Sequence, residues 1–296
     1  MSSTVAPKPH PIPWQVQAMR LGFHSLGPLL PGLAGRVALR LFSTPQRRLI
    51  AERDQAVMAS AQTVTIPHGG LNLIGYMWGQ GPTILLMHGW ESSASYLAGF
   101  VKPLVERGFR VVAFDAPAHG TSPGRQTNLV DFSQAEQAVV ARFGPVHGVI
   151  GHSFGGASTV TMLELNPTLS LTRLVLIASP AKLSQAIDSF SKLAHLPASV
   201  IHHMNDLIHH RFGRSVDSFD IKNLAASLPM PGLVIHDRLD DVIPFSEAEA
   251  IVSLWPQASL LPTEGLGHRR ILRDPQVIRH VVDFLALEKV ETIDNG

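Results

Sequence analysis

Cysteine is absent from this 296-residue chain, which excludes disulfide bonds, thiolate metal ligands and cysteine-based catalysis. A chain without cysteine suits a reducing compartment, so a cytoplasmic location is expected. Charge is also scarce: 16% of the residues are charged and the formal net charge is +1. This balance argues against a surface that tracks the phosphates of a nucleic acid. The longest uncharged stretch near the N-terminus, residues 21–35, is interrupted by prolines and glycines, so neither a membrane-spanning helix nor a signal peptide is predicted.

Apolar residues make up 45% of the sequence, enough to bury the core of one large domain that carries an insertion. From residue 61 onward, short apolar runs typical of buried strands alternate with helix-length segments. The predicted strands are residues 62–66, 71–78, 83–87, 110–114, 147–152, 174–178, 232–236 and 258–261. The predicted helices are residues 95–107, 128–143, 154–166 and 275–287. This alternation predicts an α/β fold with a doubly wound, mostly parallel sheet.

The alternation fails in two places, and these define the other parts of the chain. Between residues 181 and 228 helical segments follow one another without a strand, which predicts a helical cap above the carboxyl ends of the strands. Residues 1–60 form a predicted N-terminal helical arm, whose third helix is expected to begin at Thr44 and Pro45. The α/β core is then expected at residues 61–180 and 229–290.

The arm is basic and amphipathic. Apolar residues between Val16 and Leu30 recur every three or four positions, which places them on one helical face. Its charged residues are Lys8, Arg20, Arg36, Arg40, Arg47, Arg48, Glu52, Arg53 and Asp54. Such an arm can make a weak contact with a membrane surface or dock on a partner. The alternative is that its helices pack against their own domain and leave the arginines in water.

A serine at the apex of a strand-to-helix turn is the first candidate for chemistry. Gly151 and Gly155 bracket Ser153 in a G-x-S-x-G pattern, directly after an apolar run. This is the pattern of a nucleophile elbow, in which small residues let the backbone turn tightly around a strained serine. The serine then lies at a helix N-terminus, where backbone N–H groups favour developing negative charge.

A serine hydroxyl needs a base, and the base needs a carboxylate that orients it. In this architecture the expected order along the chain is serine, acid, histidine. Downstream of Ser153 a buried strand ends in a carboxylate-rich loop, and His268 follows the next strand. The carboxylates of that loop are Asp237, Asp240 and Asp241. Because the carboxyl ends of parallel strands lie at one edge of the sheet, the acid and the histidine are expected to converge on the serine.

Together these motifs make the chain resemble an α/β-hydrolase. A His-Gly turn follows the third strand at His88 and Gly89, and an Asp-x-x-x-His-Gly turn follows the fourth at residues 115–120. The elbow, the acid loop and the Gly-His motif at His268 complete the series. The likeness covers residues 62–287 apart from the cap, and it implies a serine hydrolase with a Ser-Asp-His triad.

The resemblance assigns the catalytic roles residue by residue. Ser153 matches the nucleophile, His268 the general base and Asp240 the acid. The family's strand-end pattern places the aspartate about four residues before a proline, and Pro244 fits Asp240. Asp241 is the adjacent rival, whereas Asp237 occupies a position that is often glycine in the family.

The oxyanion hole requires two backbone N–H donors. Phe154 follows the nucleophile and supplies one donor. By resemblance Trp90, which follows the His-Gly turn, supplies the second. His88 and His152 are expected to orient backbone groups rather than to take part in the chemistry.

The function expected from these features is hydrolysis of a small-molecule carboxylic ester, with no metal and no organic cofactor implied. Apolar residues of the cap suggest a pocket for a small or medium acyl chain. They are Leu183, Ile187, Phe190, Leu193, Leu196 and Leu207. Thioesterase, amidase, carbon–carbon bond hydrolase and acyltransferase reactions would use the same triad and stay open. A non-catalytic binding member of the fold is the alternative from another class.

A histidine-rich stretch of the predicted cap, residues 202–210, suggests a different kind of site. On a helix, His203, Asp206 and His210 share one face at a spacing that could ligate a metal. No H-E-x-x-H motif accompanies them. A polar helix rich in imidazole is therefore the preferred interpretation.

Overall fold

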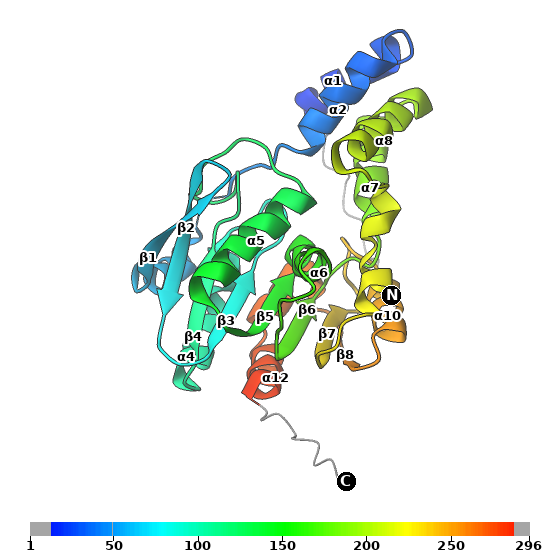
Figure 1. Ribbon diagram of the computed structural model, residues 1–296. Coiled ribbons are helices and arrows are strands. Elements are labelled where there is room, and N and C mark those ends of the chain that lie inside the picture. Colours follow the sequence, from blue (N-terminus) through cyan, green and yellow to red (C-terminus); the bar gives the residue numbers. More distant parts are fainter. Residues whose placement is uncertain (1–12, 49, 287–296) are drawn as a thin grey trace, which may run out of the picture. The chain divides into compact units, whose positions relative to one another are not determined.

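The computed structural model describes residues 13–48 and 50–286, and Figure 1 shows its elements. The chain divides into two compact units. We call the described parts of residues 1–42 and 184–218 the helical unit, and those of residues 43–183 and 219–296 the sheet unit. Each unit has its own hydrophobic core.

The sheet unit is built around one eight-stranded sheet. The strands are β1 Gln62–His68, β2 Leu71–Trp78, β3 Thr83–Met87, β4 Arg110–Phe114, β5 Val146–His152, β6 Arg173–Ile177, β7 Gly232–Asp237 and β8 Ala258–Thr263. Their order in the sheet is β1-β2-β4-β3-β5-β6-β7-β8. Only the β1–β2 and β2–β4 pairs are antiparallel, and every other pair is parallel. The predicted α/β class and doubly wound, mostly parallel sheet are confirmed.

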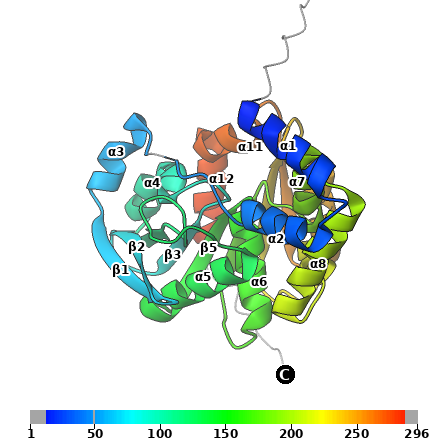
Figure 2. The ribbon, with the colours of Figure 1, turned by 90° about the horizontal axis from the view of Figure 1, so that it is seen from above.

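Helices cover both faces of this sheet. The helical elements of the sheet unit are α3 Glu52–Ala59, η1 Ala94–Phe100, α4 Val101–Glu106, α5 Leu129–Phe143, α6 Phe154–Leu165, α9 Ile221–Ala225, α10 Phe245–Leu254, α11 Gly267–Arg270, η3 Ile271–Arg273 and α12 Pro275–Ala286. Helices α5 and α6 lie on one face, and α4 and α12 lie on the other (Figure 2). The central strands β3 and β6 are buried along their whole length, as expected for strands covered on both sides.

The helical unit combines the N-terminal helices with helices of the insertion. Its elements are α1 Trp14–Leu26, α2 Pro31–Phe42, α7 Ser184–Ala194 and α8 Ala198–Phe212, with η2 Val216–Phe219 at its end. Helix α2 packs on α8, and α1 contacts α7. The α2–α8 approach is close, because a Cβ placed on Gly35 would lie 2.8 Å from Cβ of His203. The expected arm and cap therefore contribute helices to one compact unit, instead of the separate arm and cap that the sequence suggested.

The third N-terminal helix begins later than expected. It starts at Glu52, and residues 44–48 are not helical. Instead Arg47 donates hydrogen bonds from its guanidinium to the carbonyls of Gly120 and Gly124, at 2.7 and 2.9 Å. These contacts hold the segment extended along the loop after β4, and this long-range pairing overrides the local Thr44-Pro45 start pattern.

The helix predicted at residues 95–107 is interrupted. It forms as η1 followed by α4. Pro103 has no N–H to donate to the carbonyl of Gly99 four residues earlier, so a continuous α-helix would lose that hydrogen bond. At the other end of the chain, the predicted boundaries at 287 and 290 and the first twelve residues of the arm lie outside the described residues.

Candidate active site

Ser153 occupies the turn between β5 and α6. Its backbone angles are φ 53° and ψ −124°, in the left-handed half of the map that a residue with a side chain rarely adopts. The backbone N–H of Ser153 donates to the carbonyl of Ile177 at 2.9 Å, which ties the turn to β6. A Cβ on Gly155 would lie 2.4 Å from the Met87 carbonyl oxygen, so only glycine lets α6 start this close to β3. The predicted elbow is present.

A chain of hydrogen bonds joins Ser153, His268 and Asp240. The Oγ of Ser153 lies 3.1 Å from Nε2 of His268, and Nδ1 of His268 lies 2.8 Å from Oδ2 of Asp240. Nδ1 therefore carries the proton that Asp240 accepts, and Nε2 is free to accept the serine proton. The Asp240 side chain is fully buried and that of His268 is 8% exposed. The three predicted side chains meet at the carboxyl ends of β5, β7 and β8, the edge of the sheet at which they were expected to converge.

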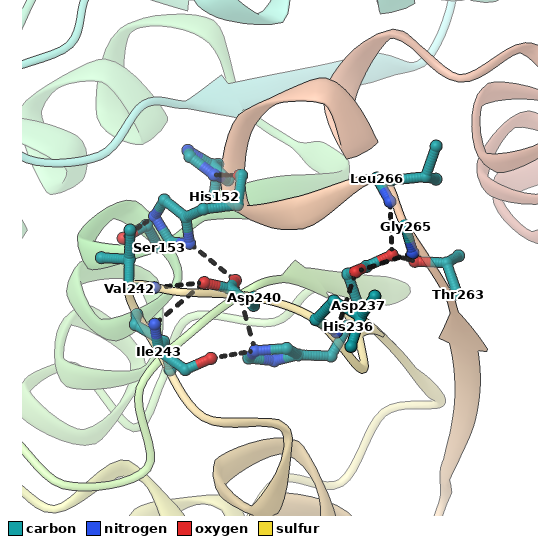
Figure 3. A network of polar contacts seen from close by, with 12 residues as sticks. His152, Ser153, His236, Asp237, Asp240, Val242, Ile243, Thr263, Gly265 and Leu266 are labelled. Atoms are coloured by element: carbon teal, nitrogen blue, oxygen red, sulfur yellow. Dashed lines mark hydrogen bonds and ion pairs between the residues drawn. The ribbon is translucent and has the colours of Figure 1, made fainter. Parts of the chain in front are cut away.

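The carboxylate of Asp240 is held on both oxygens (Figure 3). Its Oδ1 accepts the backbone N–H groups of Val242 at 2.8 Å and Ile243 at 2.9 Å. His236 lies beneath it, with Nε2 2.8 Å from the Ile243 carbonyl and 3.4 Å from Oδ2 of Asp240. Burial alone would raise the pKa of Asp240, but the hydrogen bonds from His236, His268 and Ile243 outweigh burial and hold the pKa below its usual range. The sequence analysis did not identify His236, since nothing in a strand-end histidine indicates what it faces.

The rival acids occupy different environments. Asp237 is fully buried and accepts the Thr263 hydroxyl at 2.7 Å and the Leu266 N–H at 2.9 Å (Figure 3). Burial would raise its pKa, but Thr263 and the loop N–H groups lower it overall. Asp237 thus fixes the loop that carries His268, while Asp241 is exposed. Of the three carboxylates, it is Asp240 that contacts the histidine.

The two predicted backbone donors lie beside the serine. A Cβ placed on Gly89 would be 3.1 Å from Cβ of Ser153, so the turn after β3 passes directly alongside the nucleophile position. The rings of Trp90 and Phe154 pack edge to face, with centroids 5.3 Å apart. Within residues 13–48 and 50–286, no backbone carbonyl accepts the N–H of Trp90 or of Phe154. Both donors are thus available to an oxygen bound next to Ser153.

Two buried histidines hold the turn that contains Trp90. Nε2 of His88 accepts a hydrogen bond from the backbone N–H of Ala116 at 3.0 Å. The ring proton is therefore on Nδ1, which donates to the Gly89 carbonyl at 2.8 Å. His119 receives the Glu91 N–H on Nε2 at 3.0 Å. Burial lowers the pKa of His88 to about 4 and that of His119 to about 3, so both rings are neutral and Nε2 can accept.

His152 supports the other side of the site. Its Nε2 donates to the backbone carbonyl of His268 at 2.9 Å, so it positions the backbone of His268. Burial, and then the proximity of His268, lower the pKa of His152 to about 3. The ring is therefore neutral under physiological conditions. His88 and His152 thus contact backbone groups, in the manner expected from the sequence.

Glu136 is a buried acid behind the elbow that the sequence analysis did not identify. It lies on α5 and accepts the hydroxyl of Ser158 at 2.8 Å. Its other oxygen is 2.6 Å from the hydroxyl of Thr159, which in turn lies 3.1 Å from the Gly155 carbonyl. Burial raises the pKa of Glu136 to about 8. The protonated carboxyl can donate to Thr159, which leaves the Thr159 hydroxyl free to donate to Gly155, one of the elbow glycines.

The histidine-rich stretch lies on α8 and does not gather the three proposed ligands. Asp206 pairs with His202 at 3.3 Å, and the ring of His203 lies against Gly32 of α2. Among residues 13–48 and 50–286, no group of three or more histidine, aspartate or glutamate side chains is arranged to hold a metal ion.

The apolar residues expected to line a pocket are largely used in packing. Ile187 and Leu196 are buried in the core of the helical unit, and Phe190 packs against that core and against Phe42. That these three side chains line an acyl pocket stays a prediction. The same described ranges contain no helix long and apolar enough to cross a membrane.

Comparisons with known proteins agree with this fold. The alpha/beta hydrolase family model matches residues 84–281. A non-heme haloperoxidase of Rhodococcus erythropolis is 23% identical over 242 residues, which cover 64% of this chain and 87% of that protein. A pimeloyl-[acyl-carrier protein] methyl ester esterase of Aeromonas salmonicida is 22% identical over 249 residues, covering 70% of this chain and 96% of that protein.

Solved structures share the architecture. An esterase from Exiguobacterium antarcticum superposes with a TM-score of 0.60 at 16% identity, over 76% of this chain and 100% of that chain. At this low identity the likeness shows a shared fold and nothing about substrate or mechanism. Taken with the family match, the protein belongs to the α/β-hydrolase family and is a hydrolase.

Proposed function

We propose that the protein is a serine hydrolase that cleaves a carboxylic ester through an acyl-enzyme formed on Ser153. One observation carries the proposal: the hydrogen-bonded chain from Ser153 through His268 to Asp240 lies next to two backbone N–H groups that no carbonyl in the described part of the chain accepts. A nucleophile, a base, an orienting acid and an oxyanion site are the parts that acyl transfer needs.

In the first half of the proposed reaction, Ser153 attacks the ester. Nε2 of His268 accepts the Ser153 proton across 3.1 Å as Oγ attacks the ester carbonyl carbon. The carbonyl oxygen becomes an oxyanion, which the N–H groups of Trp90 and Phe154 stabilise. Asp240 stabilises the imidazolium that forms and keeps it oriented through the 2.8 Å bond to Nδ1.

The second half releases both products. The tetrahedral intermediate collapses, and Nε2–H of His268 gives its proton to the departing alkoxide, so the alcohol leaves and the acyl group stays on Ser153. Water then attacks the acyl-enzyme while Nε2 accepts a proton from it. The second tetrahedral intermediate returns Ser153 with its proton and releases the carboxylic acid.

An ester is the preferred substrate class because the Aeromonas salmonicida relative reported above is named as a methyl ester esterase. We propose a small or medium acyl chain on the expectation that apolar residues line the site. Thioesters, amides and carbon–carbon bonds would pass through the same triad, and an alcohol in place of water would give acyl transfer. Which of these bonds is cleaved depends on contacts with the leaving group and not on the triad.

The test is hydrolysis of p-nitrophenyl esters from acetate to palmitate by the full chain, with Ser153→Ala measured alongside. Ser253→Ala is the matched control, since Ser253 is an exposed serine on α10 whose hydroxyl donates to the Ala250 carbonyl. The proposal expects turnover in the wild type and the control, a fall of about a thousandfold or more in Ser153→Ala, and a preferred chain length. Wild-type turnover that survives in Ser153→Ala would refute the role of Ser153.

A further inference from the structure

Exposed large hydrophobic side chains are concentrated on α1, α2 and the turn between them. They are Trp14, Leu21, Leu26, Leu29, Leu30, Leu33, Val37 and Leu41. The other large exposed hydrophobics of the described chain are scattered: Leu165, Leu193, Leu239, Val242 and Leu254. Single exposed leucines are ordinary, but a concentration of exposed apolar side chains on two neighbouring helices points to an interaction site. We call the eight clustered residues the apolar face of the helical unit.

The apolar face is distinct from the faces that the helices use for packing. On α2, Leu33, Val37 and Leu41 recur every fourth position, which places them along one side of the helix. The opposite side carries Gly35 and Ala38, which are buried in the contact with α8 and its core. Helix α2 therefore has two apolar sides, and only one of them is needed to hold the unit together.

The turn between the helices and α1 both expose large apolar side chains on this surface. Leu29 is 74% exposed and Leu26 is 58% exposed, on either side of Gly27 and Pro28. Trp14 at the start of α1 is 73% exposed. Leucines at a helical turn, with a tryptophan at one edge, are the side chains that enter the boundary between headgroups and acyl chains.

The charge of the same segment has one sign. The sequence contains no aspartate or glutamate before Glu52. On α2, Arg36 and Arg40 are exposed on the solvent side, next to the row formed by Leu33, Val37 and Leu41. The acidic residues of the helical unit lie instead on the insertion, at Asp188, Asp206 and Asp217. The exposed Arg36 beside the leucine row of α2 thus adds positive charge to the apolar face, which is complementary to an anionic surface.

We propose that the apolar face of the helical unit docks on an anionic phospholipid membrane. The leucines of α2 and of the turn insert among the headgroups, and Arg36 binds a lipid phosphate. The chain then lies on the membrane surface. The docking does not depend on the reaction proposed for Ser153.

The experiment is co-sedimentation of the full chain with vesicles of phosphatidylcholine, with and without about one third phosphatidylglycerol. The wild type is expected to bind the anionic vesicles more tightly, and high salt is expected to weaken that binding. Arg36→Gln should weaken binding to the anionic vesicles about fivefold and leave binding to neutral vesicles unchanged.

A pair of matched double variants tests the apolar part. Val37→Ser with Leu41→Ser removes two side chains that are each 43% exposed, and Leu165→Ser with Leu254→Ser removes two that are 41% and 43% exposed on the sheet unit. The first pair should weaken vesicle binding about tenfold or more, and the second should leave it unchanged. Circular dichroism and thermal unfolding check that both variants fold.

Three results would overturn the proposal. The wild type could bind anionic vesicles no better than neutral ones. The two double variants could bind vesicles equally. Sedimentation velocity could instead show a dimer that Val37→Ser with Leu41→Ser dissociates, without any vesicle binding, in which case a second copy of the chain covers this face.

Discussion

Nε2 of His119 lies 3.0 Å from the backbone nitrogen of Glu91, the residue that directly follows Trp90. On the other side of Trp90, Nδ1 of His88 holds the carbonyl of Gly89 at 2.8 Å. The N–H of Trp90 belongs to the same peptide group as that carbonyl, so the two histidines fix the peptide groups before and after Trp90. The direction of the proposed oxyanion donor is thereby set by buried neutral imidazoles.

Replacement of His119 should therefore act on the rate and not on binding. In His119→Phe the ring volume is kept but the Glu91 N–H loses its acceptor, so the turn is less well held. We expect kcat for ester hydrolysis to fall about tenfold to a hundredfold, less than for complete loss of an oxyanion donor, with KM little changed. His280→Phe, on the exposed side of α12, is the control. A larger KM with unchanged kcat would contradict this role.

The choice between neighbouring aspartates can be tested directly. Asp240→Asn removes the charge that faces His268 and lets the imidazole adopt the wrong tautomer, so kcat/KM should fall about a thousandfold or more. Asp241→Asn changes an exposed carboxylate and should stay within about twofold. Steady-state kinetics with one ester settles the assignment, and equal losses in both variants would refute it.

The elbow glycines have a steric role that a methyl group can probe. A Cβ on Gly155 would lie 2.4 Å from the Met87 carbonyl, whereas a Cβ on Gly22 of α1 has nothing within 4 Å. Gly155→Ala should lower the free energy of unfolding by about 2 kcal/mol and reduce activity, because α6 must move away from β3. Gly22→Ala should be neutral or slightly stabilising. Denaturant unfolding curves measure both, and an unaffected Gly155→Ala would contradict the close approach.

Glu136 is expected to make the free energy of unfolding depend on pH, and the direction of its pKa shift fixes the sign. Its pKa is about 8 in the folded chain, against an ordinary value of 4.5, so between these values the folded state holds an extra proton. The free energy of unfolding must then fall as pH rises through this window. The free energy of unfolding of the wild type minus that of Glu136→Gln should fall by up to about 1.4 kcal/mol for each unit that the pH rises.

Subtracting the two profiles cancels the contribution of the buried histidines, whose effect runs in the opposite direction at lower pH. Glu249→Gln, which alters an exposed carboxylate on α10, should give a flat difference. Urea unfolding at several pH values between about 5 and 8 is the measurement. A flat difference for Glu136→Gln would mean that the carboxyl is ionised in the folded state.

Much of the sheet was predictable because each buried strand can be recognised from the residues of that strand alone. A buried parallel strand must be apolar along its length, and the runs at β3 and β4 predicted both strands with their observed bounds. Parallel topology then brings strand ends to one edge, so Ser153, His268 and a carboxylate of the acid loop could be predicted to meet without knowledge of any distance. The choice of Asp240 among those carboxylates came from the resemblance to the family.

The contacts between distant segments were not predictable in the same way. Arg47 holds residues 44–48 extended through carbonyls more than seventy positions away, so the local helix-start pattern at Thr44 failed. The packing of α2 on α8 depends on Gly35 meeting His203, which no periodicity reveals. His236 and Glu136 were missed for a similar reason, since a buried polar side chain is recognised by its partners and not by its spacing.

The most direct test of the central claim is the mass of the protein after reaction with a fluorophosphonate that targets activated serines. The account predicts one phosphonyl group per chain, located by peptide mapping on Ser153, and none on Ser153→Ala. Labelling should also fall strongly in Asp240→Asn but not in Asp241→Asn. A folded wild-type chain that takes up no label, or that takes it up at another residue, would contradict the assignment of Ser153 as the nucleophile.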